Sequence, residues 1–435
     1  MALGGGTFVA QNKGLPGAYI NFVSKASASA TLSERGIATM PLELDWGPAG
    51  EVFEVTNGDF QKNCMDIFGY EYTHEKMKGL RDLFLNAKTL YAYRLNKSGQ
   101  RAGNAMAEAL YPGTRGNDLK ITVQINADDE TLFEVTTLLG TIEVDKQTVS
   151  DGGKLVPNKY VKWKTGITLE EKAALPLTGG TDGEVNGASH QDYLDKIESY
   201  TYNTMGVVVT DDITKGLYAA FVKRLRGEMG IKFQLVLYDY EADYMGTVSV
   251  KNKVLDKECS EASLVYWVTG ASAGCAVNKS IQNRKYDGGF TVDAPYTQNQ
   301  LAAAIRNGEF TFHKVGADIR VLEDINTMVT TSDTMGDVFK DNQTIRVIDQ
   351  IGNDIAVLFN TKYLGVVPND AAGRISLWSD IVAHHRQLQD IRAIEGFSDS
   401  DVVVEQGSTK KAVVVEDAVV VVNTMSRLYM TVMVE

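Results

Sequence analysis

Residues 205–238 read MGVVVTDDITKGLYAAFVKRLRGEMGIKFQLVLY, and this stretch decides the fold. It opens on an apolar run at 205–210 and closes on a second one at 231–238, and both suit buried strands. Between them, residues 211–227 have the apolar spacing of an amphipathic helix, with one predicted inner face made of Ile213, Leu217, Phe221 and Leu225. We therefore predict a βαβ unit whose strands lie parallel in a sheet covered by helices.

The same alternation occurs nearer the N-terminus, with strands predicted at 52–55 and 89–95 and helices at 59–68 and 75–87. Between the two α/β stretches the pattern changes to short strands with polar turns, predicted at 119–125, 132–138, 141–144 and 160–163. This change indicates an all-β insertion. Two further amphipathic helices, at 338–358 and 375–394, precede the last strands.

The predicted fold class is therefore α/β and α+β multidomain, with a discontinuous α/β domain, an inserted all-β domain and a C-terminal α+β domain. The predicted boundaries are an N-terminal arm at 1–23, the α/β domain at 24–100 and 189–330, the β-rich insertion at 101–188, the C-terminal core domain at 331–426 and a terminal strand at 427–435.

The last part of the chain is rich in valine. Three runs, at 401–405, 412–416 and 418–423, precede the alternating segment RLYMTVMVE at 427–435. Because the last predicted strand extends to the final residue, we expect the chain to end on an unpaired sheet edge. An edge of this kind favours strand addition by another copy, so the sequence indicates a protein that acts within an assembly.

Composition narrows the class of protein. The chain has 435 residues, 44% of them hydrophobic and 23% charged, which is typical of a soluble protein of several domains. A net charge of -13 disfavours binding to nucleic acid, and without a long apolar run we expect no membrane insertion. No secretion signal is visible, so we expect a cytoplasmic protein, with Cys64, Cys259 and Cys275 as buried free thiols.

One motif suggests catalysis. Residues 270–274, GASAG, match the G-x-S-x-G elbow of serine hydrolases and follow an apolar run at 264–268. A working elbow needs a later histidine, and neither His313 nor the pair His384 and His385 has a recognisable loop context. Small residues that permit close helix packing are the favoured interpretation, and a hydrolase built on Ser272 is the alternative.

Other candidate sites are weaker. The glycine-rich loop at 179–187 lacks the Lys-Ser/Thr of a P-loop, which favours a connector. His384 and His385 are adjacent, so on a helix they point about 100° apart and cannot bind one metal ion by themselves; we expect both to be exposed. Residues 128–130 are contiguous acids without calcium-loop spacing. We predict no catalytic, cofactor-binding or metal-binding residue.

Six short stretches carry a family resemblance. They are GGGTF (4–8), PGAYINF (16–22), ERGIATMP with LDWGP (34–48), LTGGTDG (177–183), HQDY (190–193) and DNQTIR (341–346). In this order they resemble contractile tail sheath proteins of myophages, prophages and phage-tail-like bacteriocins of Gram-positive bacteria. The resemblance spans nearly the whole chain.

The resemblance implies a virion structural protein without enzymatic activity or cofactor. Its copies would polymerise as stacked hexameric rings around a tail tube and contract to drive the tube through the target cell envelope. The implied partners are neighbouring sheath subunits, the tail tube protein, and the baseplate and tail terminator proteins. The implied location is the tail of a virion or phage-tail-like particle that is assembled in the bacterial cytoplasm. A non-contractile structural or adhesin-like protein is the remaining alternative.

By the same resemblance, residues 7–23 and 427–435 would be linking strands that join a neighbour's sheet at 402–404 and 413–422. The candidate linking residues are Thr7, Phe8, Val9, Tyr19, Phe22, Leu428, Tyr429, Met430, Val432 and Val434. The helix at 375–394 is a candidate contact with the tube, through Asp380, Arg386, Asp390 and Arg392. An equal alternative is that this helix only covers the terminal sheet.

Overall fold

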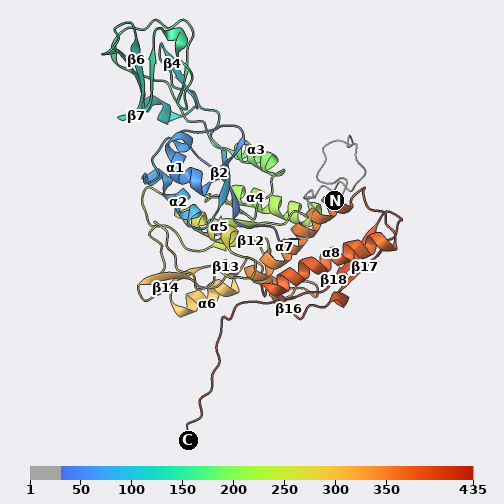
Figure 1. Cartoon of the computed structure of the whole chain (residues 1–435). Coiled ribbons are helices and arrows are strands. Elements are labelled where there is room, and N and C mark those ends of the chain that lie inside the picture. The colour runs from blue at the N-terminus through green and yellow to red at the C-terminus, as the bar shows by residue number, and fades with distance from the viewer. Residues whose placement is uncertain (1–30, 435) are drawn as a thin grey trace, which may run out of the picture. The chain divides into compact units, whose positions relative to one another are not determined.

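The computed structural model describes residues 31–434 and is shown in Figure 1. The described chain divides into two compact units. We call residues 33–353, 388–396 and 419–434 the larger unit, and residues 354–387 and 397–418 the smaller unit. The predicted N-terminal linking residues, Thr7, Phe8, Val9, Tyr19 and Phe22, lie outside the described residues.

A seven-stranded sheet forms the centre of the larger unit, in the order β13-β12-β11-β10-β1-β3-β2. All neighbours are parallel except β2 and β3, which are antiparallel. The chain builds one side of β1 first and the other side later, as in doubly wound folds. The strands are β1 (Ile37–Leu42), β2 (Val52–Thr56), β3 (Thr89–Arg94), β10 (Thr204–Gly206), β11 (Gln234–Tyr238), β12 (Thr247–Val250) and β13 (Glu309–Phe310).

Helices cover both faces of this sheet, because successive strand residues point to opposite sides. Leu90 and Val236 pack in one core with Trp267, and Tyr93 and Leu237 pack in the other with the residues of α3 and α4. The helices of the first face are α1 (Asn57–Phe68), α2 (Lys78–Phe84) and α5 (Val265–Gly274); those of the second are α3 (Gly187–Ile197) and α4 (Asp212–Arg224). The unit also contains α6 (Gln298–Arg306) and the hairpin of β14 (Phe312–Val315) and β15 (Asp318–Val321).

The predicted βαβ unit is present as β10, α4 and β11. Its helix is turned differently from the prediction: Ile213 is 89% exposed, and the buried face carries Tyr218, Phe221 and Val222 instead. Asp211 caps the helix by accepting a hydrogen bond from the N–H of Thr214 at 2.8 Å. Spacing alone did not resolve the face, because a first-turn apolar residue can be left outside when aromatic residues further along fill the core.

The β-rich insertion contains a four-stranded antiparallel sheet in the order β7-β6-β5-β9, together with the pair β4-β8. Its four predicted strands are all found, one of them with the predicted bounds. The strands are β4 (Ala107–Ala109), β5 (Leu119–Ile125), β6 (Phe133–Leu139), β7 (Ile142–Val149), β8 (Val161–Trp163) and β9 (Lys172–Pro176). Trp46 of the motif LDWGP is buried in the core of this region, stacked on Tyr160 at 6.1 Å between ring centroids.

The smaller unit is built on the helices α7 (Asn342–Leu358) and α8 (Ala371–Asp390), which also extend into the larger unit, and on a hairpin of β17 (Val402–Gln406) and β18 (Val413–Asp417). Its core gathers Leu358, Leu377, Ile381, Val382 and Val402. In the larger unit, β16 (Ile394–Glu395) pairs with β19 (Val420–Val421). No helix in residues 31–434 is long and apolar enough to cross a membrane.

Candidate assembly interface

The hairpin of β17 and β18 leaves main-chain groups unused. Hydrogen bonds from the N–H of Ala418 to the carbonyl of Asp401 (3.1 Å) and from the N–H of Gly407 to the carbonyl of Ala412 (2.8 Å) fix the phase of its ladder. Bonded pairs alternate along an antiparallel ladder, so Val413, Val415 and Asp417 direct their N–H and C=O groups away from β17. Within residues 31–434 this sheet has only two strands. The outer side of β18 is therefore an open edge.

The two edges of the hairpin differ. On β17, the indole N–H of Trp378 donates to the carbonyl of Val402 at 3.0 Å and so satisfies the start of that edge. One face of the hairpin packs inward through Val402, Val404 and Val413. The opposite face, with Val403 and Val414, is exposed. An added strand would therefore find free hydrogen-bonding groups along β18.

A groove of about 540 Å³ adjoins the start of β18 within the smaller unit. Its lining is largely apolar and includes Leu364, Val366, Leu377 and Val413. Asn369 holds its floor to the hairpin, because its side-chain N–H donates to the carbonyl of Ala412 at 2.8 Å.

His384 and His385 are both buried, so the prediction of exposed histidines is wrong. Nε2 of His384 lies 3.0 Å from Asp354, and Nε2 of His385 lies 2.9 Å from Asp417 on β18. Nδ1 of His385 also contacts the carbonyl of Ile381 at 2.9 Å. Both helix faces are covered in this unit, which the sequence pattern of α8 did not reveal. The two histidines bind α8 to its neighbours.

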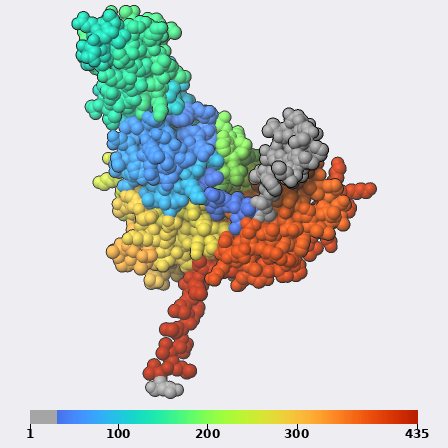
Figure 2. Space-filling model, viewed as in Figure 1, coloured from blue at the N-terminus to red at the C-terminus, as the bar shows by residue number. Residues whose placement is uncertain are grey.

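The predicted terminal strand is not part of a sheet in the isolated chain, so the expectation that the chain ends on a sheet edge is wrong. Residues 424–434, which we call the C-terminal arm, have no strand partner among the described residues. The large apolar side chains of this arm are 67–102% exposed. Figure 2 shows the arm in red as an extended segment. The open edge belongs to β18, and 420–421 pair with β16 rather than with the hairpin.

Gln343 fixes the base of the C-terminal arm. Its side-chain N–H donates to the carbonyl of Val422 and its side-chain oxygen accepts from the N–H of Thr424, both at 3.0 Å. The amide thus satisfies the backbone as a neighbouring strand would. Beside it, the side chain of Asn423 donates to the hydroxyl of Thr344 at 3.2 Å. The arm leaves the folded unit after these contacts.

Gln343 belongs to the motif DNQTIR, whose other members anchor the start of α7. The carboxylate of Asp341 accepts from the N–H groups of Gln343 (2.7 Å) and Thr344 (3.2 Å), which explains why the helix begins at Asn342 and not at the predicted 338. The side-chain N–H of Asn342 donates to Asp324 at 3.0 Å.

Arg346 and Asp324 form an ion pair beneath this turn, and both side chains are 1% exposed. Burial alone would raise the pKa of Asp324, but the charge of Arg346 and the N–H of Ile281 outweigh it, and the pKa is lowered. The charge of Asp324 likewise overcomes the effect of burial on Arg346, whose pKa is raised. The arm therefore starts from a rigid, fully paired polar core.

The four predicted tube-contact residues fall into two groups. Asp380 accepts hydrogen bonds from Lys362 (2.6 Å) and Tyr363, and Arg386 pairs with Asp399 at 2.7 Å. Asp390, the last residue of α8, and Arg392 are exposed. Arg392 has a φ of 60°, because the chain reverses there to enter β16.

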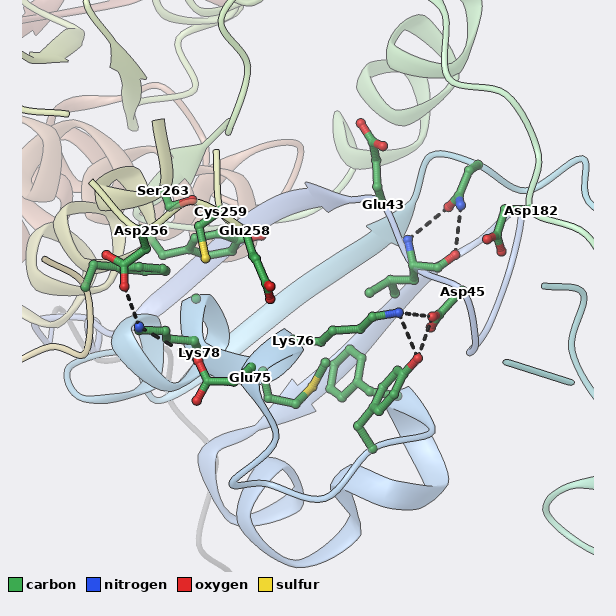
Figure 3. Close-up of a pocket in the computed structure, with 18 of the residues that line it drawn as sticks. Glu43, Asp45, Glu75, Lys76, Lys78, Asp182, Asp256, Glu258, Cys259 and Ser263 are labelled. Carbon is green, nitrogen blue, oxygen red and sulfur yellow. Dashed lines mark hydrogen bonds and ion pairs between the residues drawn. The ribbon is translucent and has the colours of Figure 1, made fainter. Parts of the chain in front are cut away.

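A cleft of about 800 Å³ lies in the larger unit and is shown in Figure 3. Six carboxylates and three lysines line it. Lys76 pairs with Asp45, and Lys78 lies 2.9 Å from Asp256. Cys259 is partly exposed here, contrary to prediction, but burial still raises its thiol pKa. No group of three metal-ligating side chains is found in the described part of the chain.

The G-x-S-x-G motif is not a nucleophile elbow. Residues 265–274 form α5, so the strand that an elbow requires is missing, and Ser272 is buried. A Cβ at Gly270 would lie 2.2 Å from the carbonyl oxygen of Leu83, and one at Gly274 would lie 2.0 Å from that of Asn86. The small residues let α5 approach the end of α2, as the packing interpretation predicts.

Four family models match the chain in succession. They are the tail sheath protein Gp18 domain III N-terminal region (35–95), the phage tail sheath protein beta-sandwich domain (87–182), the phage tail sheath protein central domain (183–327) and the phage tail sheath C-terminal domain (334–435). The Phage-like element PBSX protein XkdK of Bacillus subtilis (strain 168) is 31% identical, and the match covers 99% of each chain.

Solved structures are similar over the same extent. The sheath tail protein from Desulfitobacterium hafniense is 37% identical, with a TM-score of 0.83, and the match covers 95% of this chain and 99% of that one. The anti-feeding prophage helical sheath in its contracted state is 12% identical, with a TM-score of 0.58 over 97% of this chain and 99% of that one, and therefore shares the fold alone.

Proposed function

The chain belongs to the phage tail sheath protein family, and from this premise we propose that its copies polymerise as stacked hexameric rings around a tail tube and contract. It is a structural subunit of a contractile tail sheath and not an enzyme. Contraction would drive the tube through the envelope of a target cell. A sheath of this kind belongs to a virion or a tail-like particle.

The C-terminal arm is the observation that carries the proposal. Its apolar side chains are uncovered in the isolated chain, and burying each of them would contribute roughly 1.5–3 kcal/mol. Ordering the backbone would cost about 1–2 kcal/mol per residue, so the arm needs both apolar contacts and main-chain hydrogen bonds to stay in place. The open edge of β18 offers such bonds to a neighbour's arm.

An arm of this kind also suits contraction. Residues 427–434 would span about 26 Å as a strand, at about 3.3 Å per residue. Main-chain bonds at the far end do not depend on the orientation of the unit that the arm leaves. Rigid units can then rotate about the arm as about a hinge while neighbours stay joined. We assign the N-terminal residues 7–23 the same linking role.

Contact with the tube is assigned to the C-terminal part of α8 and the residue after its turn. Asp390 and Arg392 are the better candidates, since both are exposed and their charges can make contacts that salt screens and rotation releases. Asp380 and Arg386 already have partners within the smaller unit, so their role would require exchanging those partners. The baseplate and the tail terminator would bind the two ends of the sheath.

Electron microscopy and sedimentation of the purified chain at rising concentration test the proposal. The full chain should form hollow striated cylinders, alone or on added tube protein, and a chain lacking residues 427–435 should remain a folded monomer. The matched control keeps the length of the arm and replaces only Thr431 by Ser, which should assemble normally. Assembly of the shortened chain into the same cylinders would contradict the linking role of the arm.

A further inference from the structure

The arm and the groove beside β18 are complementary, and this carries one inference beyond assembly itself. We infer that the groove lined by Leu364, Val366 and Val413 receives the aliphatic side chains of the C-terminal arm of a second copy, laid along the open edge of β18. The inference rests on the proposed function, and it specifies the surface and the side of the arm that make the contact.

The groove is unusually apolar for a surface feature. Leu364 is 60% and Val366 is 73% exposed, and both lie in the turn between α7 and α8. Contiguous exposed apolar side chains of this kind mark interaction sites. Their exposure in the isolated chain leaves the groove ready for an apolar occupant.

Continuity with β18 determines where the occupant lies. Val413 directs its main-chain groups to the open edge, and its side chain lines the groove. A strand added to this edge would lie about 4.8 Å from β18. Its inward side chains would then project over the helices and, at the Val413 end, into the groove.

The arm has one fully aliphatic side. Strand residues alternate, so one side carries Leu428, Met430, Val432 and Val434, and the other carries Tyr429, Thr431 and Met433. The hydroxyl of Thr431 would lose its water in the groove but keep it on the outer face. The outer face of the hairpin exposes Val403 and Val414, beside which Tyr429 and Met433 can pack. The aliphatic side therefore faces inward.

Paired full-length variants test the assignment of sides. Met430→Asp and Val366→Glu should each abolish assembly, because each places a charge in the apolar contact. Thr431→Asp and Val357→Glu are the matched controls; Val357 is 59% exposed on the same unit but does not line the groove. Both controls should assemble within about threefold of the concentration that the unchanged chain requires, whereas the two test variants should require more than about tenfold. Far-UV circular dichroism verifies that every variant is folded.

Mixing the two test variants shows whether contact is between copies. Met430→Asp keeps an intact groove and Val366→Glu keeps an intact arm, so together they should form discrete one-to-one complexes by analytical ultracentrifugation. Assembly of Val366→Glu at the concentration of Val357→Glu would overturn the groove. So would the absence of complexes in the mixture, or binding of a peptide of residues 1–23 to the Met430→Asp chain that Val366→Glu weakens while a peptide of residues 424–435 does not bind.

The inference and the proposed function fail separately. If deletion of residues 427–435 stops assembly but Val366→Glu does not, the arm links subunits elsewhere and the groove is overturned. If the mixed variants form complexes but the unchanged chain forms no cylinders even on tube protein, the groove stands and the sheath arrangement fails.

Discussion

Replacing Arg346 by Met should destabilise the larger unit by about 3–5 kcal/mol, because it removes one partner of a buried ion pair and leaves the other charge unpaired. Asp324 would keep the N–H of Ile281 at 3.0 Å and the hydroxyl of Ser280 at 3.1 Å, but no cation. With roughly 2–4 °C per kcal/mol for a large domain, the melting temperature should fall by about 6–20 °C. The methylene chain of Met fills part of the space, so the cost is mainly electrostatic.

The matched control makes the same substitution at an exposed ion pair. Arg386 and Asp399 form a pair whose side chains are 61% and 44% exposed, and Arg386→Met should cost less than about 1 kcal/mol. Calorimetry of both variants at a concentration below assembly gives the comparison. If Arg346→Met loses no more stability than Arg386→Met, burial does not make the Asp324 pair costly to break, and the reasoning is refuted.

Three further outcomes are expected. Gly270→Ala should cost about 1–3 kcal/mol, because its Cβ meets the carbonyl oxygen of Leu83, whereas Gly227→Ala, with open space around its Cβ, should cost less in the same urea titration. Because the folded pKa of Asp324 is lowered, its stabilisation is present above its unfolded value of 3.8 and is lost as the pH falls through the folded pKa, so the melting difference between the unchanged chain and Asp324→Asn should stay constant from pH 7 to about 4 and shrink below it; a constant difference at lower pH would contradict this. Gln343→Ala should speed amide exchange at the base of the arm about tenfold, as loss of about 1.4 kcal/mol implies, without changing exchange in β5.

Strands with strict alternation were the most predictable part of the fold. The strand at Leu119–Ile125 was predicted with its observed bounds, because burial on one face imposes a period of two that the sequence displays directly. Helix faces were less predictable: the apolar Ile213 is outside and the polar His384 is inside. In both cases tertiary contacts decided the outcome, since a histidine with a carboxylate partner can be buried and an apolar residue beyond the core is left exposed.

The assembly residues were predicted only where local pattern carries them. The arm was recognised from the alternation of 427–435, but its partner surface was not. Leu364 and Val366 lie in an irregular turn without periodicity, and the groove exists only where that turn meets a hairpin about 50 residues later. The role of Gln343 depends on bonds to residues 79 and 81 positions away, and its place in DNQTIR was the only signal.

Gln343 also determines where mechanical load enters the subunit. A pull on the arm reaches Val422 and Thr424 first, and these residues are held by the side chain of Gln343 as well as by the two-residue strand β19. The force passes from there to the first turn of α7, where Asn342 is bonded to Asp324. Tension between neighbouring subunits is thus delivered to the most deeply buried polar cluster near the arm, and the weak terminal strand does not have to bear it alone.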